Sequence, residues 1–298
     1  MKESKTLKLF ARGGLGNQLF QVLALEKLSR DLDRNPIISI DWFESSFQKN
    51  SNLNTRNFEL GAFSTFNYIP IESTGGYSKA RVVRERLSLA SKGFLAPFLG
   101  YELEFNKKTN PILAIKKNVD LMGYFIHDNE IASRRSFISE RLKLSHVSNP
   151  VQIKKTVNEI SDEFVAIHLR LTDYKSFPEI FGVTNLDYFL RALELVKGLG
   201  ADIANLLVFT DDCSSAEKFL GNSIAVKQYI SPESSLSTSQ QLLLMSTSKW
   251  LICSNSTFSW WAGFLSDPSI TQVVFPREYM KGISSKDYGL QVAGWNYL

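Results

Sequence analysis

The 298-residue sequence predicts an α/β protein with largely parallel sheets, organised in two domains. The first half opens with a strand, a glycine-rich turn and a helix, in the order of a parallel β-α unit. In the second half, short apolar runs alternate with helical runs, a pattern typical of parallel strands buried on both faces. A composition of 44% hydrophobic and 21% charged residues is that of a soluble globular protein.

The first predicted domain spans residues 1–150. Its expected elements, in order, are a strand at 7–10, a glycine-rich turn at 13–16, a buried helix at 17–32 and strands at 36–41 and 118–128. Residues 45–110 carry little periodic signal apart from a basic helix expected at 79–92. The polar run at 146–150 has the composition of a linker and predicts the end of this domain.

The second predicted domain spans residues 151–298 and has the clearer pattern. Its expected strands lie at 164–169, 205–209, 223–229, 250–254 and 272–276, and its expected helices include 186–199 and 240–248. A Ser-x-x-Glu pattern at Ser214 and Glu217 predicts the start of a further helix. This alternation favours a doubly wound parallel sheet.

Charge and cysteine usage limit the classes of function. The net charge of +4 is small, and no basic run is interleaved with aromatic residues, so no nucleic-acid partner is expected. Cys213 and Cys253 lie beside apolar runs and are expected to be buried free thiols in a reducing compartment. No run has signal-peptide or membrane-spanning length, so we expect a cytoplasmic protein. Weak peripheral contact of the basic segment 79–100 with the inner face of a membrane stays open, although a solvated helix is favoured.

Three polar clusters directly follow predicted strands of the second domain. They are residues 168–174 (HLRLTDY), 210–212 (TDD) and 254–257 (SNST). In open α/β sheets, ligands bind beyond the carboxyl ends of the strands. The three clusters are therefore the expected ligand site.

The last of these clusters opens a helix. Asn255, Ser256 and Thr257 would lie at its amino terminus, where N–H groups and the helix dipole favour an anion and the hydroxyls can donate to phosphate oxygens. A purely structural interpretation stays open, in which Ser256 caps the helix and Trp260 and Trp261 anchor it in the core.

The other two clusters supply charge. Arg170 has the planar fork that suits a diphosphate, although an ion pair with Asp173 would also account for it. His168 shares a strand face with Arg170, either as a ligand or as a core residue. Asp211 and Asp212 suit hydrogen bonds to a base or ribose better than a metal, because adjacent side chains diverge and no third ligand is evident.

The glycine-rich turn of the first domain matches no phosphate motif. Leu19 stands where the dinucleotide fingerprint has its third glycine, and no Lys-Ser/Thr pair follows. Gly14 still lets the backbone approach a ligand closely, and Asn17 and Gln18 would present amides at the mouth of an interdomain cleft. A tight turn with Asn17 as the helix cap is the structural alternative.

Seven motifs occur along nearly the whole chain: GGLGNQLFQ, GYF at 123–125, HLRLTDY, LDYF at 186–189, FTDD, LLMS at 243–246 and SNSTFSWWAGFL. Together they resemble the α-1,2-fucosyltransferases, a family of bacterial surface-polysaccharide enzymes related to those that make the blood-group H antigen. The first and last motifs are the most specific.

This resemblance implies a GT-B glycosyltransferase with two Rossmann-like domains facing a cleft. The carboxy-terminal domain would hold GDP-L-fucose and the amino-terminal domain the acceptor. The reaction would be an inverting transfer of L-fucose to a hydroxyl, the 2-OH of a galactoside, on an oligosaccharide or lipid-linked glycan, without a cofactor or an obligatory metal. The alternatives are transfer of another GDP-deoxysugar such as colitose, and a non-catalytic GDP-sugar-binding protein.

The family signature His-x-Arg-Arg-x-Asp maps onto His168, Arg170 and Asp173. Leu171 stands where the second arginine usually occurs, and Gln241 stands where an acidic residue often precedes the LMS run.

The resemblance also implies roles in the reaction. Arg170, with the helix amino terminus at Ser256 and Thr257, would stabilise the charge on the departing GDP. Asp173 is the first candidate for the base that takes the acceptor proton, with Glu179 second; Asp173 could equally orient Arg170.

Overall fold

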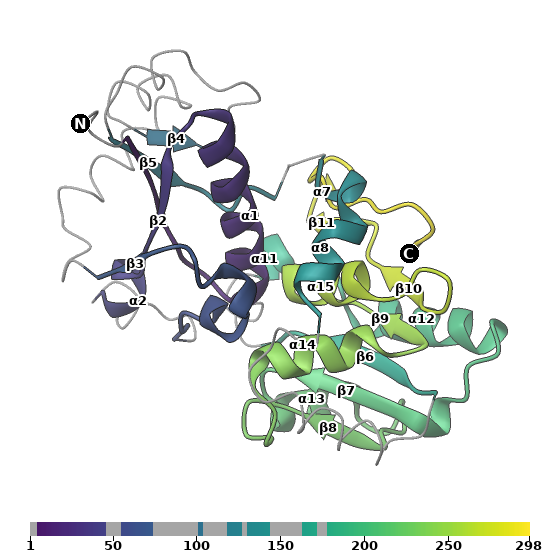
Figure 1. The fold of residues 1–298 in the computed structure, drawn as a ribbon. Helices are drawn as coiled ribbons and strands as arrows, with labels where there is room; N and C mark the ends of the chain where they lie inside the picture. The colour runs from purple at the N-terminus through teal and green to yellow at the C-terminus, as the bar shows by residue number, and fades with distance from the viewer. Residues whose placement is uncertain are drawn as a thin grey trace. The chain divides into compact units, whose positions relative to one another are not determined.

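The structure is a computed structural model that describes residues 5–45, 55–73, 101–103, 118–126, 130–143, 163–171 and 178–298. The chain divides into two compact units (Figure 1). The first comprises Met1–Gly61 and Phe66–Asp128, and the second comprises Ala62–Thr65 and Asn129–Leu298.

The first unit is built on a parallel sheet with the strand order β3-β2-β1-β5-β4. Its strands are β1 (Thr6–Phe10), β2 (Asn35–Ser39), β3 (Ile71–Glu72), β4 (Tyr101–Leu103) and β5 (Asn118–Met122). Its described helices are α1 (Leu15–Asp31) and α2 (Asp41–Glu44). The 3-10 turns η1 (Leu60–Ala62) and η2 (Ser64–Phe66) lie where the chain passes between the two units. The strands expected near 7–10, 36–41 and 118–128 are confirmed, and the basic helix expected at 79–92 lies outside the described residues.

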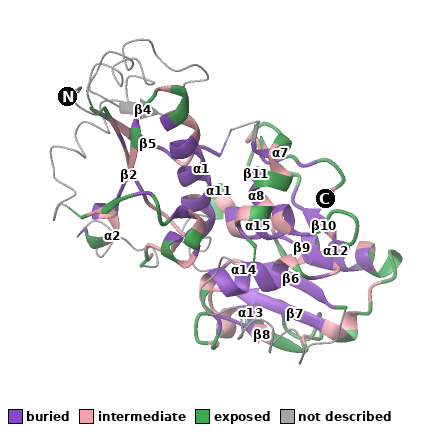
Figure 2. Cartoon of the chain, in the orientation of Figure 1, coloured by how far each residue is buried: buried purple, intermediate pink, exposed green. Residues whose placement is uncertain are grey.

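Helix α1 is buried over most of its length (Figure 2) because it is apolar on nearly all sides. It begins at Leu15 after the extended residue Gly14. Asn17 therefore lies inside the first turn and does not cap the helix, so that structural alternative is wrong. Gln21, wholly buried, accepts from the Arg12 backbone N–H at 3.1 Å and donates to the Arg12 carbonyl at 3.2 Å, which ties α1 to the end of β1.

The second unit has a parallel sheet with the strand order β13-β10-β9-β6-β7-β8. Its strands are β6 (Val165–Leu169), β7 (Leu206–Thr210), β8 (Gln228–Ile230), β9 (Trp250–Ile252), β10 (Gln272–Phe275) and β13 (Asn296–Tyr297), and β11 (Glu278–Met280) and β12 (Ile283–Ser284) form an antiparallel hairpin. Its described helices are α7 (Glu130–Ser133), α8 (Arg135–Arg141), α11 (Pro178–Phe181), α12 (Leu186–Gly198), α13 (Cys213–Leu220), α14 (Thr238–Ser246) and α15 (Thr257–Leu265), with the 3-10 turn η4 (Ile203–Asn205). Four of the five predicted strands are confirmed, whereas β8 overlaps the strand predicted at 223–229 only at Gln228 and Tyr229.

The core of the second unit lies between β6, β7 and helix α12. The helix starts at Asn185, whose side chain accepts from the Tyr188 N–H at 3.0 Å. Phe189, Leu193 and Val196 are spaced by four and three residues, so they share the face that packs on the sheet. Burying each such side chain contributes about 1.5–3 kcal/mol.

Three other helices of the second unit begin at polar caps. The Asp212 side chain caps α13 by accepting a backbone N–H of the first turn, so the start predicted at Ser214 is wrong. A carboxylate at this position also complements the helix dipole, which a serine does not. Ser237 and Gln240 form a reciprocal capping box at α14, and Ser256 caps α15.

Helix α8 belongs with the second unit because Arg135 is bonded to the carboxyl end of α15. Its Nε donates to the Phe264 carbonyl at 2.8 Å, and its Nη2 donates to the carbonyls of Gly263 and Ser266 at 3.0 Å each. These are carbonyls that the end of the helix leaves without intrahelical partners. The second unit thus includes α7 and α8, whereas the sequence predicted the division at residue 150, outside the described residues.

Both cysteines are free thiols. Cys253 is buried as predicted, whereas Cys213 is only partly buried. Burial raises the pKa of the Cys253 thiol well above its usual value, so this thiol stays protonated. Among the described helices, none has the length and apolar character needed to cross a bilayer.

Candidate functional site

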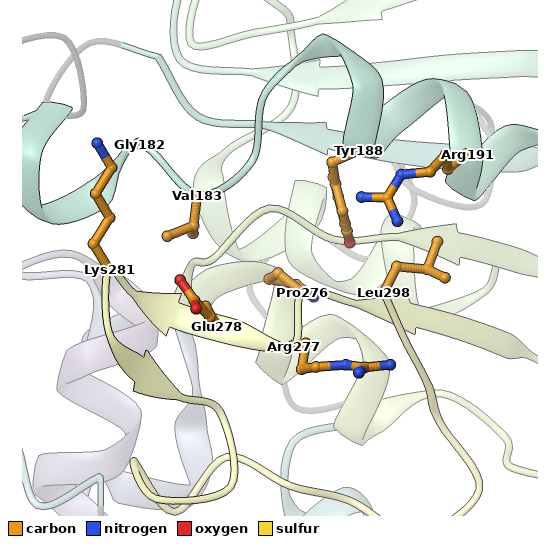
Figure 3. A pocket seen from close by; sticks show the side chains of 9 residues that line it. All are labelled: Gly182, Val183, Tyr188, Arg191, Pro276, Arg277, Glu278, Lys281 and Leu298. Atoms are coloured by element: carbon orange, nitrogen blue, oxygen red, sulfur yellow. The ribbon is translucent and has the colours of Figure 1, made fainter.

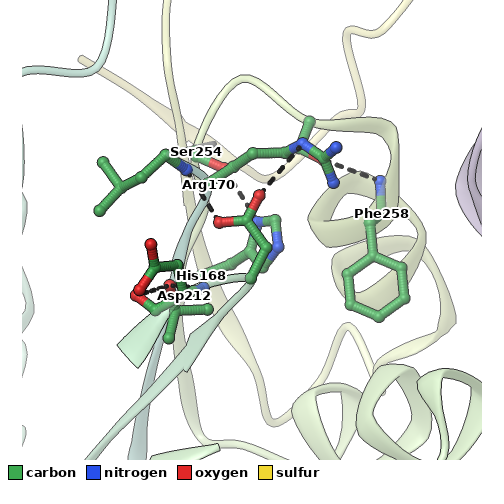
Figure 4. A network of polar contacts seen from close by, with 9 residues as sticks. His168, Arg170, Asp212, Ser254 and Phe258 are labelled. Atoms are coloured by element: carbon green, nitrogen blue, oxygen red, sulfur yellow. Dashed lines mark hydrogen bonds and ion pairs between the residues drawn. The ribbon is translucent and has the colours of Figure 1, made fainter. Parts of the chain in front are cut away.

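The polar clusters of the second unit meet at one edge of its sheet (Figure 4). Strand β6 lies between β9 and β7 and is parallel to both. The residues that follow the three strands therefore lie at the same edge. The structure brings together residues 168–171, 210–212 and 254–257, as the sequence predicted.

Arg170 pairs with Asp211 across the ends of β6 and β7. The Arg170 Nε lies 3.9 Å from Asp211 Oδ2, and the two side chains are 17% and 13% exposed. Asp211 Oδ1 accepts from the Leu171 N–H at 3.0 Å. Asp211 thus orients both the guanidinium and the adjoining backbone, whereas the sequence predicted a contact with a base or ribose. Asp173, which the structural alternative paired with Arg170, lies outside the described residues.

Two departures from the family pattern have structural explanations. Leu171 is 7% exposed and belongs to the apolar core, where an arginine would lose its hydration at a cost of several kcal/mol. Arg170 therefore supplies the charge of the motif. Gln241 donates through Nε2 to the carbonyls of Ser231 and Leu236 at 3.0 Å each, which an ionised acidic residue could not do.

His168 is a core histidine bonded to Ser254. It is 5% exposed, its Nδ1 lies 2.9 Å from Ser254 Oγ, and its ring centroid lies 5.4 Å from that of Phe258. Burial lowers the pKa of His168 from 6.5 to about 4, and the nearby charge of Asp211 opposes part of that change. The imidazole is therefore neutral near pH 7, and it links the ends of β6 and β9.

This pKa predicts a pH dependence of stability. Because the pKa of His168 is lower in the folded state, the unfolded chain binds this proton more readily between pH 4 and 6.5. The buried, neutral imidazole of His168 thus makes its full contribution to the free energy of unfolding above pH 6.5. Roughly 2–3 kcal/mol of that free energy is lost by about pH 4.5. Urea unfolding at both ends of this pH range would measure the free energy of unfolding of the native protein and of His168→Gln. Because only the native protein has the imidazole that takes up the proton, the difference between the two free energies should become smaller in acid. A constant difference would contradict the assignment.

Helix α15 presents a polar first turn at the end of β9. The Ser256 Oγ accepts from the Phe258 N–H at 3.3 Å, and Thr257 is the first helical residue. Ser256 and Thr257 are 6% and 8% exposed. Arg170 follows β6 and this turn follows β9, so a guanidinium and the positive end of a helix dipole lie at the same end of two neighbouring strands.

Asn255 holds neighbouring loops to the start of α15. It is wholly buried, and its Nδ2 donates to the carbonyls of Phe181 at 3.1 Å and Tyr279 at 2.9 Å. Its Oδ1 accepts from Thr184 Oγ1 at 3.0 Å. Asp212 likewise caps α13. These observed contacts give both residues supporting positions, and the direct ligand contacts expected from the sequence stay a prediction.

The structure describes one of the two candidate bases. Glu179 is exposed on α11, whereas Asp173 lies outside the described residues. In the part of the chain that the structure describes, no three His, Cys, Asp or Glu side chains gather into a group that could hold a metal ion.

The glycine-rich turn of the first unit follows β1. Gly13 has a φ of +77°, and a Cβ there would lie 2.7 Å from Asn17 Nδ2, so the turn requires glycine. A Cβ on Gly14 would meet only the Arg56 side chain, at 4.0 Å. Gly14 thus has space beside its backbone, and the close approach of a ligand expected there stays a prediction.

Gln18 has contacts that stabilise this turn. It is wholly buried, and its Nε2 donates to the carbonyls of Gly13 at 2.9 Å and Asn57 at 2.8 Å. Its Oε1 accepts from the Glu59 N–H at 2.9 Å. The amide expected to bind a ligand is therefore engaged with the protein itself.

Arg12 and Tyr124 form a pair that the sequence did not single out. The Arg12 guanidinium lies 5.2 Å from the centroid of the Tyr124 ring, and the two residues follow the neighbouring strands β1 and β5. Phe125 has a φ of 56°, a conformation that costs a bulky residue about 1–3 kcal/mol and is typical of functional positions. The only sequence signal for this cluster is the GYF motif.

The architecture is similar to that of solved fucosyltransferase structures. A mutant of FUT1 from Arabidopsis thaliana in complex with GDP is similar, with a TM-score of 0.53 at 10% identity over 92% of this chain and 70% of that chain. NodZ, an α-1,6-fucosyltransferase from Bradyrhizobium, has a TM-score of 0.51 at 14% identity over 89% of this chain and 93% of that chain. At these identities the likeness shows the fold alone, and it confirms the predicted GT-B fold class.

The chain belongs to glycosyl transferase family 11, whose family model matches residues 95–298, more than half of the chain. It is 29% identical to the O-antigen biosynthesis glycosyltransferase WbnK of Escherichia coli, over 91% of this chain and 93% of that protein. It is 25% identical to an α-1,2-colitosyltransferase of Escherichia coli, over 90% of both. These matches confirm the family that the seven motifs indicated and make the chain a glycosyltransferase.

Proposed function

We propose that this chain is an inverting glycosyltransferase that moves L-fucose from GDP-L-fucose to the 2-OH of a galactoside during surface-glycan synthesis. Support for the donor comes from the FUT1 and NodZ structures, both of which were determined with GDP. Support for the pathway class comes from WbnK, an O-antigen biosynthesis glycosyltransferase.

The observation that carries this proposal is that Arg170 and the amino terminus of α15 lie at the same end of two neighbouring strands, β6 and β9. A guanidinium offers a planar fork to diphosphate oxygens, and the first turn of α15 offers backbone N–H groups and hydroxyls. Asp211 orients the guanidinium, and both side chains of this pair are mostly buried, which strengthens their electrostatic effect.

The transfer step follows from this arrangement. The acceptor oxygen forms a bond to C1 of the sugar on the face opposite the diphosphate, so a β-linked donor gives an α-linked product. The bond between C1 and the diphosphate oxygen breaks, and its electron pair leaves with GDP. Arg170 and the first turn of α15 stabilise the charge that develops there. The acceptor proton goes to a carboxylate, with Asp173 the first candidate and Glu179 the second.

A second candidate donor is GDP-colitose, because one relative over 90% of the chain is an α-1,2-colitosyltransferase. Colitose and fucose are both deoxysugars, and the diphosphate contacts proposed for Arg170 and α15 would serve either donor. A non-catalytic GDP-sugar-binding protein is the remaining alternative.

A donor panel tests these assignments. The purified protein is incubated with GDP-L-fucose or GDP-colitose and galactose-terminated oligosaccharides, and the products are analysed by mass spectrometry and linkage analysis. We expect a 2-linked product with one GDP released per transfer, and the same rate in EDTA, because we propose metal-independent chemistry. Donor binding without product would favour the non-catalytic alternative. Loss of activity in EDTA that magnesium restores would show that the Asp211–Asp212 pair had been misinterpreted.

A further inference from the structure

Asn255 ties together three segments of the second unit. It is wholly buried, and its Nδ2 donates to the carbonyls of Phe181 at 3.1 Å and Tyr279 at 2.9 Å. Its Oδ1 accepts from Thr184 Oγ1 at 3.0 Å. Phe181 ends α11, Thr184 lies between α11 and α12, and Tyr279 lies in β11. Because an amide has a donor side and an acceptor side, the Thr184 hydroxyl fixes which side of Asn255 faces the two carbonyls.

Helix α11 is held in place from outside. It has four residues, too few for a helix that is stable alone. The Ile180 carbonyl accepts from the Lys281 N–H at 2.9 Å, and Lys281 lies in the turn between β11 and β12. Asn255 bonds the next carbonyl along the helix. The loop after α11 and the β11–β12 hairpin also line the same surface cavity (Figure 3). The position of α11 thus depends on the bonds that Asn255 and this hairpin supply.

Gly182 closes α11 at a position that has no room for a side chain. Its N–H donates to the Pro178 carbonyl at 3.1 Å. A Cβ on Gly182 would lie 2.5 Å from that carbonyl oxygen, closer than two such atoms can approach. Any other residue here would therefore displace α11 or the loop that follows it.

Helix α11 carries the exposed carboxylate of Glu179. In the part of the chain that the structure describes, no group forms a hydrogen bond or an ion pair with this carboxylate. Asn255, in turn, directly precedes Ser256, the cap of α15. One residue is thus bonded to the helix that carries Glu179 and continuous with the turn that we propose to bind the diphosphate.

We propose that Asn255 is a positioning residue of the transfer reaction. The Glu179 carboxylate orients the acceptor hydroxyl, and Asn255 fixes α11, and with it Glu179, relative to the donor turn of α15. Such a residue acts on kcat, because a displacement of about 1 Å between reacting groups can lower a rate about 100-fold. This role rests on the proposed transferase function.

Thr184→Val tests the role without changing Asn255 or α15. The substitution keeps the shape of the side chain but removes the hydroxyl, so the Asn255 amide can turn its oxygen toward the two carbonyls and repel them. We expect kcat to fall about tenfold and the GDP affinity to stay within about twofold of the native value. Thr184→Ser, which keeps the hydroxyl, should restore kcat. Native kcat in Thr184→Val, or a loss of kcat that Thr184→Ser does not restore, would overturn the proposal.

Thr271→Val is the matched control. Thr271 is also buried, and its Oγ1 donates to the Ser248 carbonyl at 2.7 Å. It directly precedes β10, so it lies at the amino end of the strands, away from the proposed donor site. Its loss should lower the melting temperature and leave kcat unchanged. An equal fall of kcat in both valine variants would make the effect one of general stability and overturn the proposal.

Gly182→Ala displaces α11 by a different route. The new methyl group collides with the Pro178 carbonyl, whereas Asn255, Thr184 and the donor turn keep their side chains. The same result is expected, a lower kcat with unchanged GDP affinity. Gly198→Ala is the control, because nothing lies within 4 Å of a Cβ there, and it should keep native kcat. Native kcat in Gly182→Ala would contradict a catalytic need for the position of α11.

Hydrogen exchange separates this inference from the proposed function, because it needs no substrate. Backbone N–H exchange of residues 178–184 should be faster in Thr184→Val than in the native protein, and exchange within α12 should be unchanged. If the native protein transfers no sugar but exchange responds in this way, the proposed function fails and the anchoring of α11 by Asn255 stands. If the native protein is active and Thr184→Val has faster exchange with native kcat, the proposed function stands and the positioning role fails.

Discussion

Replacing Arg170 by lysine is expected to lower kcat/KM for the GDP-sugar by about 150-fold, or about 3 kcal/mol of transition-state stabilisation. Lysine keeps the charge but lacks the planar fork that meets two diphosphate oxygens at once. It also lacks the Nε that lies 3.9 Å from Asp211 Oδ2, so its ammonium would lose the orientation that Asp211 gives the guanidinium. Steady-state kinetics with GDP titration would measure the loss.

The control for this substitution is Arg30→Lys. Arg30 is an exposed residue in the last turn of α1, where either cation complements the helix dipole. Its turnover and melting temperature should match those of the native protein. An Arg170→Lys protein with near-native turnover would remove Arg170 from the proposed mechanism. A lowered melting temperature accompanied by unchanged kcat/KM would reduce its pairing with Asp211 to a structural role.

The fold could be predicted where its signals are local. Strands β6, β7 and β9 are buried along their whole length, so they appear in the sequence as apolar runs, interrupted only by His168 in β6 and ended by Thr210 in β7. Edge strands give weaker signals. Strand β8 pairs only with β7 and begins at the exposed residue Gln228, and β13 is two residues long. The start of α13 was mispredicted because Asp212 and Ser214 are both good capping residues, and only the backbone decides between them.

The site could be predicted only in part, for a related reason. The rule that ligands bind at the carboxyl ends of parallel strands correctly gathers Arg170 and the first turn of α15 at one edge. The rule does not reveal which polar side chains are already hydrogen-bonded within the protein. Asn255 bonds the carbonyls of Phe181 and Tyr279, 74 and 24 residues away, and a backbone carbonyl has no signature in the sequence. Gln18 is engaged in the same way with Asn57.

Trp260→Ala is expected to lower the free energy of unfolding by about 3–5 kcal/mol. The indole is 3% exposed, stacks on Phe264 with ring centroids 4.8 Å apart and meets Trp261 edge-on at 5.1 Å. Its Nε1 donates to the Leu290 carbonyl at 2.8 Å, so removal leaves both a cavity and an unmatched acceptor. Trp260→Phe, which keeps a ring but not the donor, should cost less. Thermal melts of the three proteins would rank them.

Changing the first turn of α15 is expected to weaken GDP binding with little loss of stability, the reverse of the result expected for Trp260→Ala. Replacing Ser256 and Thr257 with alanine removes a cap worth about 1 kcal/mol, a small loss beside that of Trp260→Ala. It also removes two hydroxyls that we propose to donate to diphosphate oxygens, so calorimetric titration should show GDP affinity reduced by about tenfold or more. Because α15 is anchored by buried aromatic rings on its far side, its backbone should hold its position in the double variant. Unchanged GDP affinity would show that this turn caps a core helix and has no part in donor binding.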